Sequence, residues 1–246
     1  VSLITSKTRV IDASTAFRVN PDWAYGFAEL DANQREKIAG AKFVSNPGCY
    51  PQGFIALTKP LIAAGLVAAD YAFTYNAISG YSGGGRKMIE DYVAKGEAAS
   101  EFTPYALSFN HKHLPEMKLY TGTNQDVLFQ PVVGDFAQGM LTTVPLFASQ
   151  MKTGVTLAQI HDVISAYHAG QRFVEVAALG ANEPMNPEAL NNTNRMRLSV
   201  HGNEARGQFV LMANYDNLGK GASGAAVQNL NLMIGADEAA SVDLAA

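Results

Sequence analysis

Apolar residues recur at helical spacing in two long segments of the chain. The first begins at Pro51, which suits the first position of a helix, and stops at Gly65. Pro60 lies inside this run, so we expect a kink or a break there. The second segment begins at Thr156, a good N-cap residue, and stops at Gly170. The pattern therefore predicts two amphipathic helices, each burying one face.

Alternation of apolar and polar residues, typical of half-buried strands, covers much of the rest of the chain. Tyr71, Phe73 and Tyr75 alternate with smaller or polar neighbours in this way. Similar runs follow at 105–111, 127–133, 140–147, 172–177, 195–201 and 207–215. Many strands with few long helices between them predict an α+β domain with a mixed or antiparallel sheet.

The two ends of the chain carry a different pattern. Short strands are predicted at residues 9–12 and 42–45, and the turn-rich segment 19–40 between them is expected to be irregular. Residues 221–235 predict a helix of small residues, which can pack closely against a neighbour. These ends indicate part of a separate α/β unit. Because the chain opens at Val1, close to the first predicted strand, we expect it to begin within a domain.

Composition and charge narrow the range of partners. Of the 246 residues, 48% are hydrophobic and 16% charged, which suffices for a substantial core. A net charge of −4 provides no broad basic surface, so we expect no nucleic-acid partner. No apolar run approaches the ~20 residues that span a membrane, and no signal peptide is visible. We therefore expect a cytoplasmic protein without membrane contact.

The single cysteine, Cys49, lies where a tight Asn-Pro-Gly turn meets the start of a predicted helix. Free N–H groups and the positive end of the helix dipole favour a thiolate there and lower the thiol pKa. A thiolate attacks carbonyl carbon, so Cys49 is a candidate nucleophile. The alternative is a cysteine that only packs in the core, and the placement alone leaves both interpretations open.

His111 and His113 are candidate proton carriers. In an extended segment residues two apart point the same way, so both imidazoles are expected to face one side. Either one can exchange a proton with a thiolate, and the spacing does not choose between them. A metal site is one alternative, but no further cluster of histidine or cysteine lies nearby, so we expect none. Two surface histidines without a role are the other alternative.

Two loops are candidates for binding anions. Residues 79–87 place consecutive glycines between a predicted strand and a helical pattern, where exposed N–H groups can hold an anion, and Arg86 adds positive charge. Their spacing matches neither a Walker loop nor a dinucleotide fingerprint. The segment from Asp12 to Arg18 follows the first strand, and Arg18 can bind a carboxylate with two hydrogen bonds.

Seven segments together carry a specific signal that no one of them carries alone. They are VIDASTAFR (10–18), WAYGF (23–27), SNPGCYP (45–51), SGYSGGGR (79–86), HKHLPE (111–116), GML (139–141) and NLGKGASGAAVQN (217–229). In this order, over about residues 9–235, they resemble the N-acetyl-γ-glutamyl-phosphate reductases in their shorter variant. The resemblance implies a two-domain enzyme akin to the aspartate-semialdehyde dehydrogenases.

The resemblance also implies a division of the chain and a reaction. Residues 1–48 would be the remainder of a Rossmann-like NADP-binding domain, 49–216 the α+β catalytic domain, and 217–246 a helix returning to the nucleotide-binding domain. The implied reaction is NADPH-dependent reduction of N-acetyl-γ-glutamyl phosphate to N-acetylglutamate semialdehyde through a cysteine thioester, with release of phosphate. Cys49 is the implied nucleophile, and we favour His113 over His111 as the acid and base. The family also implies a homo-oligomer.

The remaining site residues follow from the same resemblance. Expected substrate contacts are Ser14, Arg18, Arg86 and Glu116. Expected NADP(H) contacts are Pro47, Ser79, Gly80, Ser82, Gly83, Asn217, Lys220 and Gln228. The loop at Gly83–Gly85 could touch phosphate of the substrate or of the cofactor, and the sequence does not decide which.

Three alternatives to the reductase remain at this point. The family's leading glycine loop has no counterpart in the sequence, so we expect weak cofactor binding, and an inactive fragment is one alternative. The others are an aspartate-semialdehyde dehydrogenase-type enzyme and a thiol hydrolase that uses Cys49 with a histidine.

Overall fold

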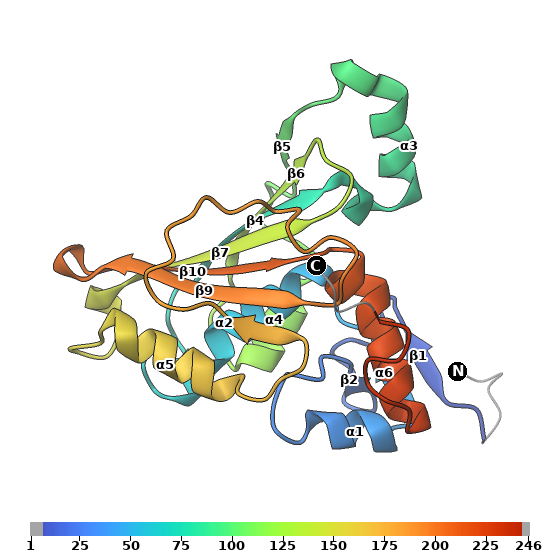
Figure 1. The fold of residues 1–246 in the computed structure, drawn as a ribbon, viewed down its shortest axis with the longest axis horizontal. Coiled ribbons are helices and arrows are strands. Elements are labelled where there is room, and N and C mark those ends of the chain that lie inside the picture. Colours follow the sequence, from blue (N-terminus) through green and yellow to red (C-terminus); the bar gives the residue numbers. More distant parts are fainter. Residues whose placement is uncertain (1–6, 243–246) are drawn as a thin grey trace.

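The strands predicted in the middle of the chain form one seven-stranded mixed sheet (Figure 1). The structure is a computed structural model and describes residues 7–242. The strand order is β5-β6-β4-β7-β10-β9-β8, with β4 parallel to β6, β8 parallel to β9, and the other neighbours antiparallel. The strands are β4 (Thr74–Gly80), β5 (Phe102–Pro104), β6 (Leu128–Gly134), β7 (Met140–Phe147), β8 (Val174–Val176), β9 (Met196–Asn203) and β10 (Gln208–Tyr215). The predicted mixed sheet is confirmed.

The predicted strand at 105–111 is wrong. Ala106 and Phe109 have φ angles of 52° and 54°, in the left-handed region, and such angles end an extended segment. The nearest strand, β5, ends before this segment. The strand that contains Tyr75 starts only at Thr74, and Tyr71 and Phe73 pack in the core ahead of it.

Three helices cover one face of the large sheet (Figure 1). They are α2 (Cys49–Ala63), α4 (Leu114–Thr121) and α5 (Leu157–Tyr167). Helix α2 lies against the middle of the sheet and is buried along most of its length. The second amphipathic helix is confirmed as α5, and Thr156 closes its first turn through a capping box with Gln159.

Pro60 neither breaks α2 nor ends it, so the predicted break is wrong. Proline has no N–H group and leaves the carbonyl of Ala56 without its helical partner. The buried His168 supplies the missing donor, because its Nε2 lies 2.9 Å from that carbonyl oxygen. The helix continues because a side chain from α5's C-terminal end completes its hydrogen bonding.

A second, smaller layer is built from the two ends of the chain. Strands β1 (Val10–Asp12), β3 (Phe43–Ser45) and β2 (Ala24–Tyr25) form a parallel sheet in that order. Helices α1 (Gln34–Gly40) and α6 (Gly224–Ile234) pack together beside it. Its core contains Ala28, Ile38, Val44 and Met233.

Two predictions concern the segments near the ends of the chain. Strand β2 and helix α1 lie in the segment 19–40 that was expected to be irregular, so that expectation is wrong. The outer limits of the predicted domains, residues 1–6 and 243–246, lie outside the described residues.

Helix α3 (Arg86–Lys95) follows the glycine-rich loop and stands away from the rest of the molecule (Figure 1). A 3-10 turn at Tyr81–Gly84 joins it to β4, as expected for a strand, loop and helix in sequence. None of its residues is buried.

Candidate active site

The candidate site is centred on the turn between β3 and α2. Gly48 is the N-cap of α2, and Cys49 is the first helical residue. A Cβ on Gly48 would lie 2.6 Å from Nε2 of His113 and 2.8 Å from Nη1 of Arg18. Only glycine therefore leaves room for an imidazole and a guanidinium to approach the backbone beside the cysteine.

Glu116 connects this turn to α4. Its Oε1 accepts a hydrogen bond from Arg18 at 3.0 Å, and its Oε2 accepts from the Tyr25 hydroxyl and the Gly48 N–H, both at 2.9 Å. Burial raises the pKa of Glu116, and the Arg18 charge and these donors oppose that effect. Because three donors meet its two oxygens, the carboxylate form fits the site.

The surroundings of Cys49 favour the protonated thiol. Burial raises the pKa of Cys49 to about 11 and outweighs the N–H group of Tyr50 and the charge of Arg18, which act in the opposite direction. The sequence predicted a lowered pKa from the helix N-terminus alone. Desolvation wins here because the first turn of α2 lies under other parts of the chain.

Both histidines of the predicted pair face the cysteine's cavity, but not because the segment is extended. Residues 111–113 form a turn leading into α4, and the His113 N–H donates to Nδ1 of His111 at 3.2 Å. Burial lowers the pKa of His111 to about 4 and lowers that of His113 well below its usual value. Both imidazoles are therefore neutral at pH 7, and a neutral imidazole can accept a proton.

A cavity of about 620 Å³ opens beside Cys49. The predicted site residues that line it are Cys49, His111, His113, Arg18, Pro47, Ser79, Gly80, Ser82, Gly83 and Asn217. Asn217 is fixed by two hydrogen bonds, from its Nδ2 to the Ser82 hydroxyl and from the Gly139 N–H to its Oδ1. The structure thus brings the turn before α2, the glycine-rich loop and the turn before α6 to one place.

One wall of the cavity is made of small residues. A π-helical turn, Gly219–Ser223, precedes α6, and a Cβ on Gly221 would lie 3.1 Å from Cβ of Cys49. Asn46 holds this turn in place by donating to the carbonyl of Ala222 at 2.9 Å. The wall beside Cys49 is apolar and lacks large side chains, because it is formed by Gly221, Ala222 and Ala226. A flat ring can lie against such a surface.

Three predicted substrate contacts do not line the cavity. Ser14 is exposed and bonds to Asp12, and Arg86 is exposed and pairs with Glu90 at 2.6 Å. Glu116 lies behind the cavity wall, where it holds Arg18.

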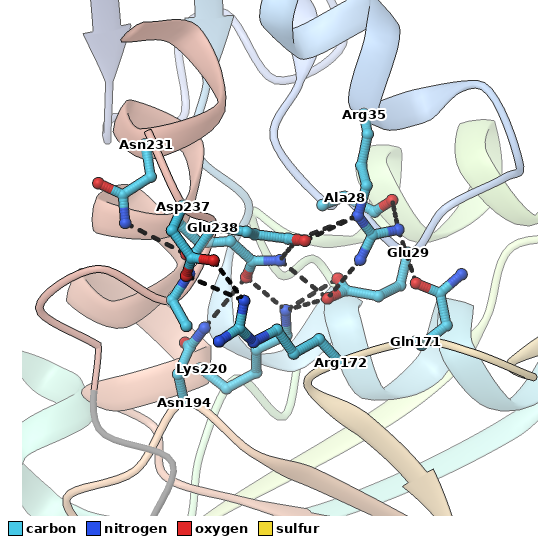
Figure 2. Close-up of polar contacts among 12 residues, drawn as sticks. Ala28, Glu29, Arg35, Gln171, Arg172, Asn194, Lys220, Asn231, Asp237 and Glu238 are labelled. Carbon is cyan, nitrogen blue, oxygen red and sulfur yellow. Dashed lines mark hydrogen bonds and ion pairs between the residues drawn. The ribbon is translucent and has the colours of Figure 1, made fainter. Parts of the chain in front are cut away.

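Lys220, predicted as a cofactor contact, belongs to a buried polar cluster (Figure 2) and does not line the cavity. Gln228, predicted as another cofactor contact, belongs to the same cluster and does not line the cavity either. The Lys220 ammonium donates to both carboxylate oxygens of Glu29 at 2.8 Å and lies 5.5 Å from the rings of Phe27 and Phe173. Gln228 donates to Glu29 and accepts from Lys220. Burial opposes ionisation of Glu29, but Lys220 outweighs it and holds the pKa of that carboxyl below its usual range.

Of the cavity-lining residues that were not predicted as site residues, three bear on the chemistry of the cavity. They are Lys112, Tyr105 and Gly221. Lys112 stands between the two predicted histidines in the sequence and lines the same cavity. Tyr105, whose hydroxyl lies 3.2 Å from that of Tyr50, fell in the wrongly predicted strand.

Residues 7–242 contain neither a candidate metal site nor a candidate membrane span. No group of three or more histidine, cysteine, aspartate or glutamate side chains there could hold a metal ion. In the same part of the chain, no helix is both long and apolar enough to cross a membrane.

Comparisons with known proteins place this geometry in a family context. A family model described as the semialdehyde dehydrogenase dimerisation domain matches residues 49–217. The N-acetyl-gamma-glutamyl-phosphate reductase of Mesorhizobium japonicum is 56% identical over 241 residues, covering 96% of this chain and 78% of the relative. The protein of the same name from Brucella ovis is 49% identical over 237 residues, covering 94% and 76%.

Solved structures support the same fold at much lower sequence identity. Aspartate semialdehyde dehydrogenase II from Vibrio cholerae superposes with a TM-score of 0.70 at 17% identity, covering 92% of this chain and 72% of that one. The aspartate semialdehyde dehydrogenase from Francisella tularensis has a TM-score of 0.66 at 15% identity, covering 91% and 74%. At this identity the likeness concerns the fold alone.

Proposed function

The chain belongs to the N-acetyl-γ-glutamyl-phosphate reductase family, and from this we propose that it reduces N-acetyl-γ-glutamyl phosphate to N-acetylglutamate semialdehyde, with release of phosphate. The observation that carries the proposal is the placement of the only cysteine, Cys49, at a helix N-terminus in a cavity that His111 and His113 also line. We also propose the domain division given by the resemblance, with the cavity lying where the two sheets meet.

The reaction needs a nicotinamide cofactor, and we propose NADP(H). The small-residue wall at Gly221 and Ala222 fits a flat ring beside the sulfur, and Asn217, Ser82 and Gly83 would hold the cofactor's polar groups. Bound there, the reduced cofactor supplies a hydride to the carbon attached to the sulfur.

In the proposed mechanism Cys49 attacks the acyl carbon of the substrate. An S–C bond forms, the C–O bond to phosphate breaks, and the two electrons of that bond leave with phosphate. Because the resting thiol is protonated, its proton must leave as the bond forms. The tetrahedral oxyanion forms beside the free N–H groups at the start of α2, which stabilise it.

His113 is the proposed proton acceptor. Its Nε2 lies over Gly48, next to the cysteine, while its buried Nδ1 has no hydrogen-bond partner among the described residues. The imidazole takes the thiol proton during attack. When the thioester carbon has been reduced and its C–S bond breaks, His113 would return the proton to the departing sulfur as the aldehyde forms.

Replacement of the nucleophile tests the proposal. We expect Cys49→Ser and Cys49→Ala to lower kcat by at least about 10³-fold, since both remove the thiolate. The measurement is phosphate-dependent reduction of NADP⁺ with N-acetylglutamate semialdehyde, the reverse reaction. Wild-type rates in Cys49→Ser would overturn the mechanism.

The same assay separates the alternatives. Aspartate semialdehyde in place of the N-acetylated substrate tests the sister dehydrogenase activity, and we expect a much lower kcat/KM. A thiol hydrolase would instead release acid from an acyl thioester with no cofactor present. Turnover that stays strictly dependent on phosphate and NADP⁺ therefore argues against hydrolysis.

We further propose a homo-oligomer. The matched family is described as a dimerisation domain, and no helix of residues 7–242 covers the face of the large sheet opposite α2 (Figure 1). Partly exposed apolar side chains on β7 and β10 of that face alternate with the buried ones, as in Leu141 and Met212. Light scattering coupled to size exclusion is expected to give a mass of at least twice 26.2 kDa, and a monomer at micromolar concentration would contradict the proposal.

A further inference from the structure

We propose that Lys112 binds an anionic group of the substrate, either the phosphate or the carboxylate. Among the described residues that line the cavity, its ammonium is the positive charge that is not paired with a carboxylate. This inference rests on the proposed function, because it assigns a binding role within the same site. Lys112 lies between His111 and His113, lines the cavity and is exposed to solvent, so it stands at the cavity's mouth.

Few positively charged side chains line the cavity. Among the described residues that line it, the lysine and arginine side chains are Arg18 and Lys112. Arg18 is 8% exposed and already occupied: its Nη1 donates to Glu116, its Nε to the Asn46 carbonyl and its Nη2 to the Ala13 carbonyl. The ion pair with Glu116 cancels its charge, so Arg18 contributes N–H donors but little net attraction.

Lys112 has no such partner. None of the hydrogen bonds or ion pairs found within residues 7–242 engages its ammonium group, and the nearby imidazoles are neutral. The charge still reaches the reacting group, because Lys112 is one of the influences that lower the pKa of Cys49 against the effect of burial. Its flexible stem allows the ammonium to follow a bound anion as a point charge.

The substrate class supplies more anionic charge than the rest of the cavity can neutralise. An acyl phosphate with a free carboxylate carries two separate anionic groups. The N-terminus of α2 and the glycine-rich loop offer N–H dipoles, and Arg18 offers its spare N–H groups. A full unpaired positive charge within the cavity is available only from Lys112 among the described lining residues.

Alkylation of the single cysteine tests this without any turnover. Iodoacetate is an anion and iodoacetamide is its neutral analogue, and both modify one site because Cys49 is the only cysteine. The ratio of their rates cancels the fraction of thiolate, so it reports how well an anion is attracted to the cavity. We expect Lys112→Gln to lower that ratio about tenfold at low ionic strength.

Matched variants make the result specific. Lys118→Gln removes another exposed lysine, which lies on α4 and pairs with Asp126 outside the cavity, and we expect an unchanged ratio. Lys112→Arg keeps the charge and is expected to retain most of the wild-type ratio. Circular dichroism establishes that each variant is folded. A Lys112→Gln ratio equal to that of wild type would overturn the proposal.

Kinetics then identify the anionic group. In the reverse reaction, a raised KM for inorganic phosphate in Lys112→Gln assigns the residue to the phosphate, and a raised KM for the semialdehyde assigns it to the carboxylate. If both KM values match wild type, Lys112 does not bind substrate and the proposal fails. If the wild-type protein shows no turnover, the proposed function fails, while the alkylation ratio still tests the anion site.

Discussion

At the scale of single residues, His168 compensates for the hydrogen bond that Pro60 removes from helix α2. The proline leaves the Ala56 carbonyl without a helical donor, and Nε2 of His168 supplies one. The pair lies far along α2 from the cysteine, yet it keeps the helix that carries the cysteine continuous. A helix interrupted at Pro60 would lose its last turn against the sheet.

The burial of His168 predicts a pH-dependent stability. Burial lowers the pKa of His168 from 6.5, so the folded protein keeps the imidazole neutral while the unfolded chain binds a proton below about pH 6.5. Stability is therefore present above that pH and is lost as the pH falls. We expect the Tm of His168→Gln to fall less steeply than that of wild type between pH 7 and pH 5.

Glutamine can still donate to the Ala56 carbonyl but cannot titrate in this range, so both proteins should have similar Tm values at pH 8. His111 and His113 give the wild type the same direction of change, so some slope remains in the variant. Identical slopes in the two proteins would show that His168 is protonated equally in the folded and unfolded states.

At the scale of elements, Glu116 ties the start of α4 to the start of α2. The carboxylate receives the backbone N–H of the residue before Cys49 and also holds Arg18 at the cavity wall. Two helix N-termini are thus fixed to each other through one buried side chain. The position of Cys49 therefore depends on the hydrogen bonds of Glu116 as well as on helix α2.

A double-mutant cycle measures the interaction free energy between Glu116 and Arg18. We expect Glu116→Gln to lower the free energy of unfolding by about 3 kcal/mol, because it leaves the guanidinium of Arg18 buried without a counter-charge. Arg18→Met combined with Glu116→Gln should cost less than the sum of the two single changes. Urea denaturation gives the three values.

The exposed pair Arg86 and Glu90 is the control for this cycle, and Arg86→Gln is expected to change stability by no more than about 0.5 kcal/mol. Strict additivity of the Arg18 and Glu116 changes would mean that the two side chains do not act as a pair.

At the scale of the whole molecule, the buried cluster in Figure 2 joins distant parts of the chain. Glu29 follows β2, Lys220 precedes α6, and the Glu29 carboxylate also lies 3.7 Å from Arg35 of α1. Arg35 in turn pairs with Glu238 near the C-terminal end of the described chain. The cluster fixes the turn before α6, and with it the small-residue wall beside Cys49.

Breaking the central pair of this cluster is expected to be costly. Glu29→Gln leaves the ammonium of Lys220 buried without its carboxylate, and we expect a loss of about 3–5 kcal/mol in the free energy of unfolding. Chemical denaturation with two spectroscopic probes measures it. A loss below about 1 kcal/mol would mean that Lys220 is neutral in the folded protein.

Local patterns predicted most of the fold because they depend on neighbouring residues. Alternation located β6, β7, β9 and β10 to within a residue or two, and capping located α5. The pattern failed at 105–111, where Ala106 and Phe109 take left-handed conformations that alternation does not reveal.

The sequence motifs around Cys49 and around His111 and His113 pointed to residues that line the cavity. The position of Lys220 was not predictable, because its partner Glu29 is 191 positions away. A lysine in a glycine-rich turn suggests a ligand contact, and only the folded chain places the carboxylate beside it.

The raised pKa of Cys49 also bears on how the protein withstands oxidants. Peroxides convert thiolates, not thiols, to sulfenic acid. Because burial raises the pKa of Cys49, the thiolate is the minor form at pH 7. The same burial that favours the thiol is therefore expected to slow oxidation of Cys49, which would end its activity.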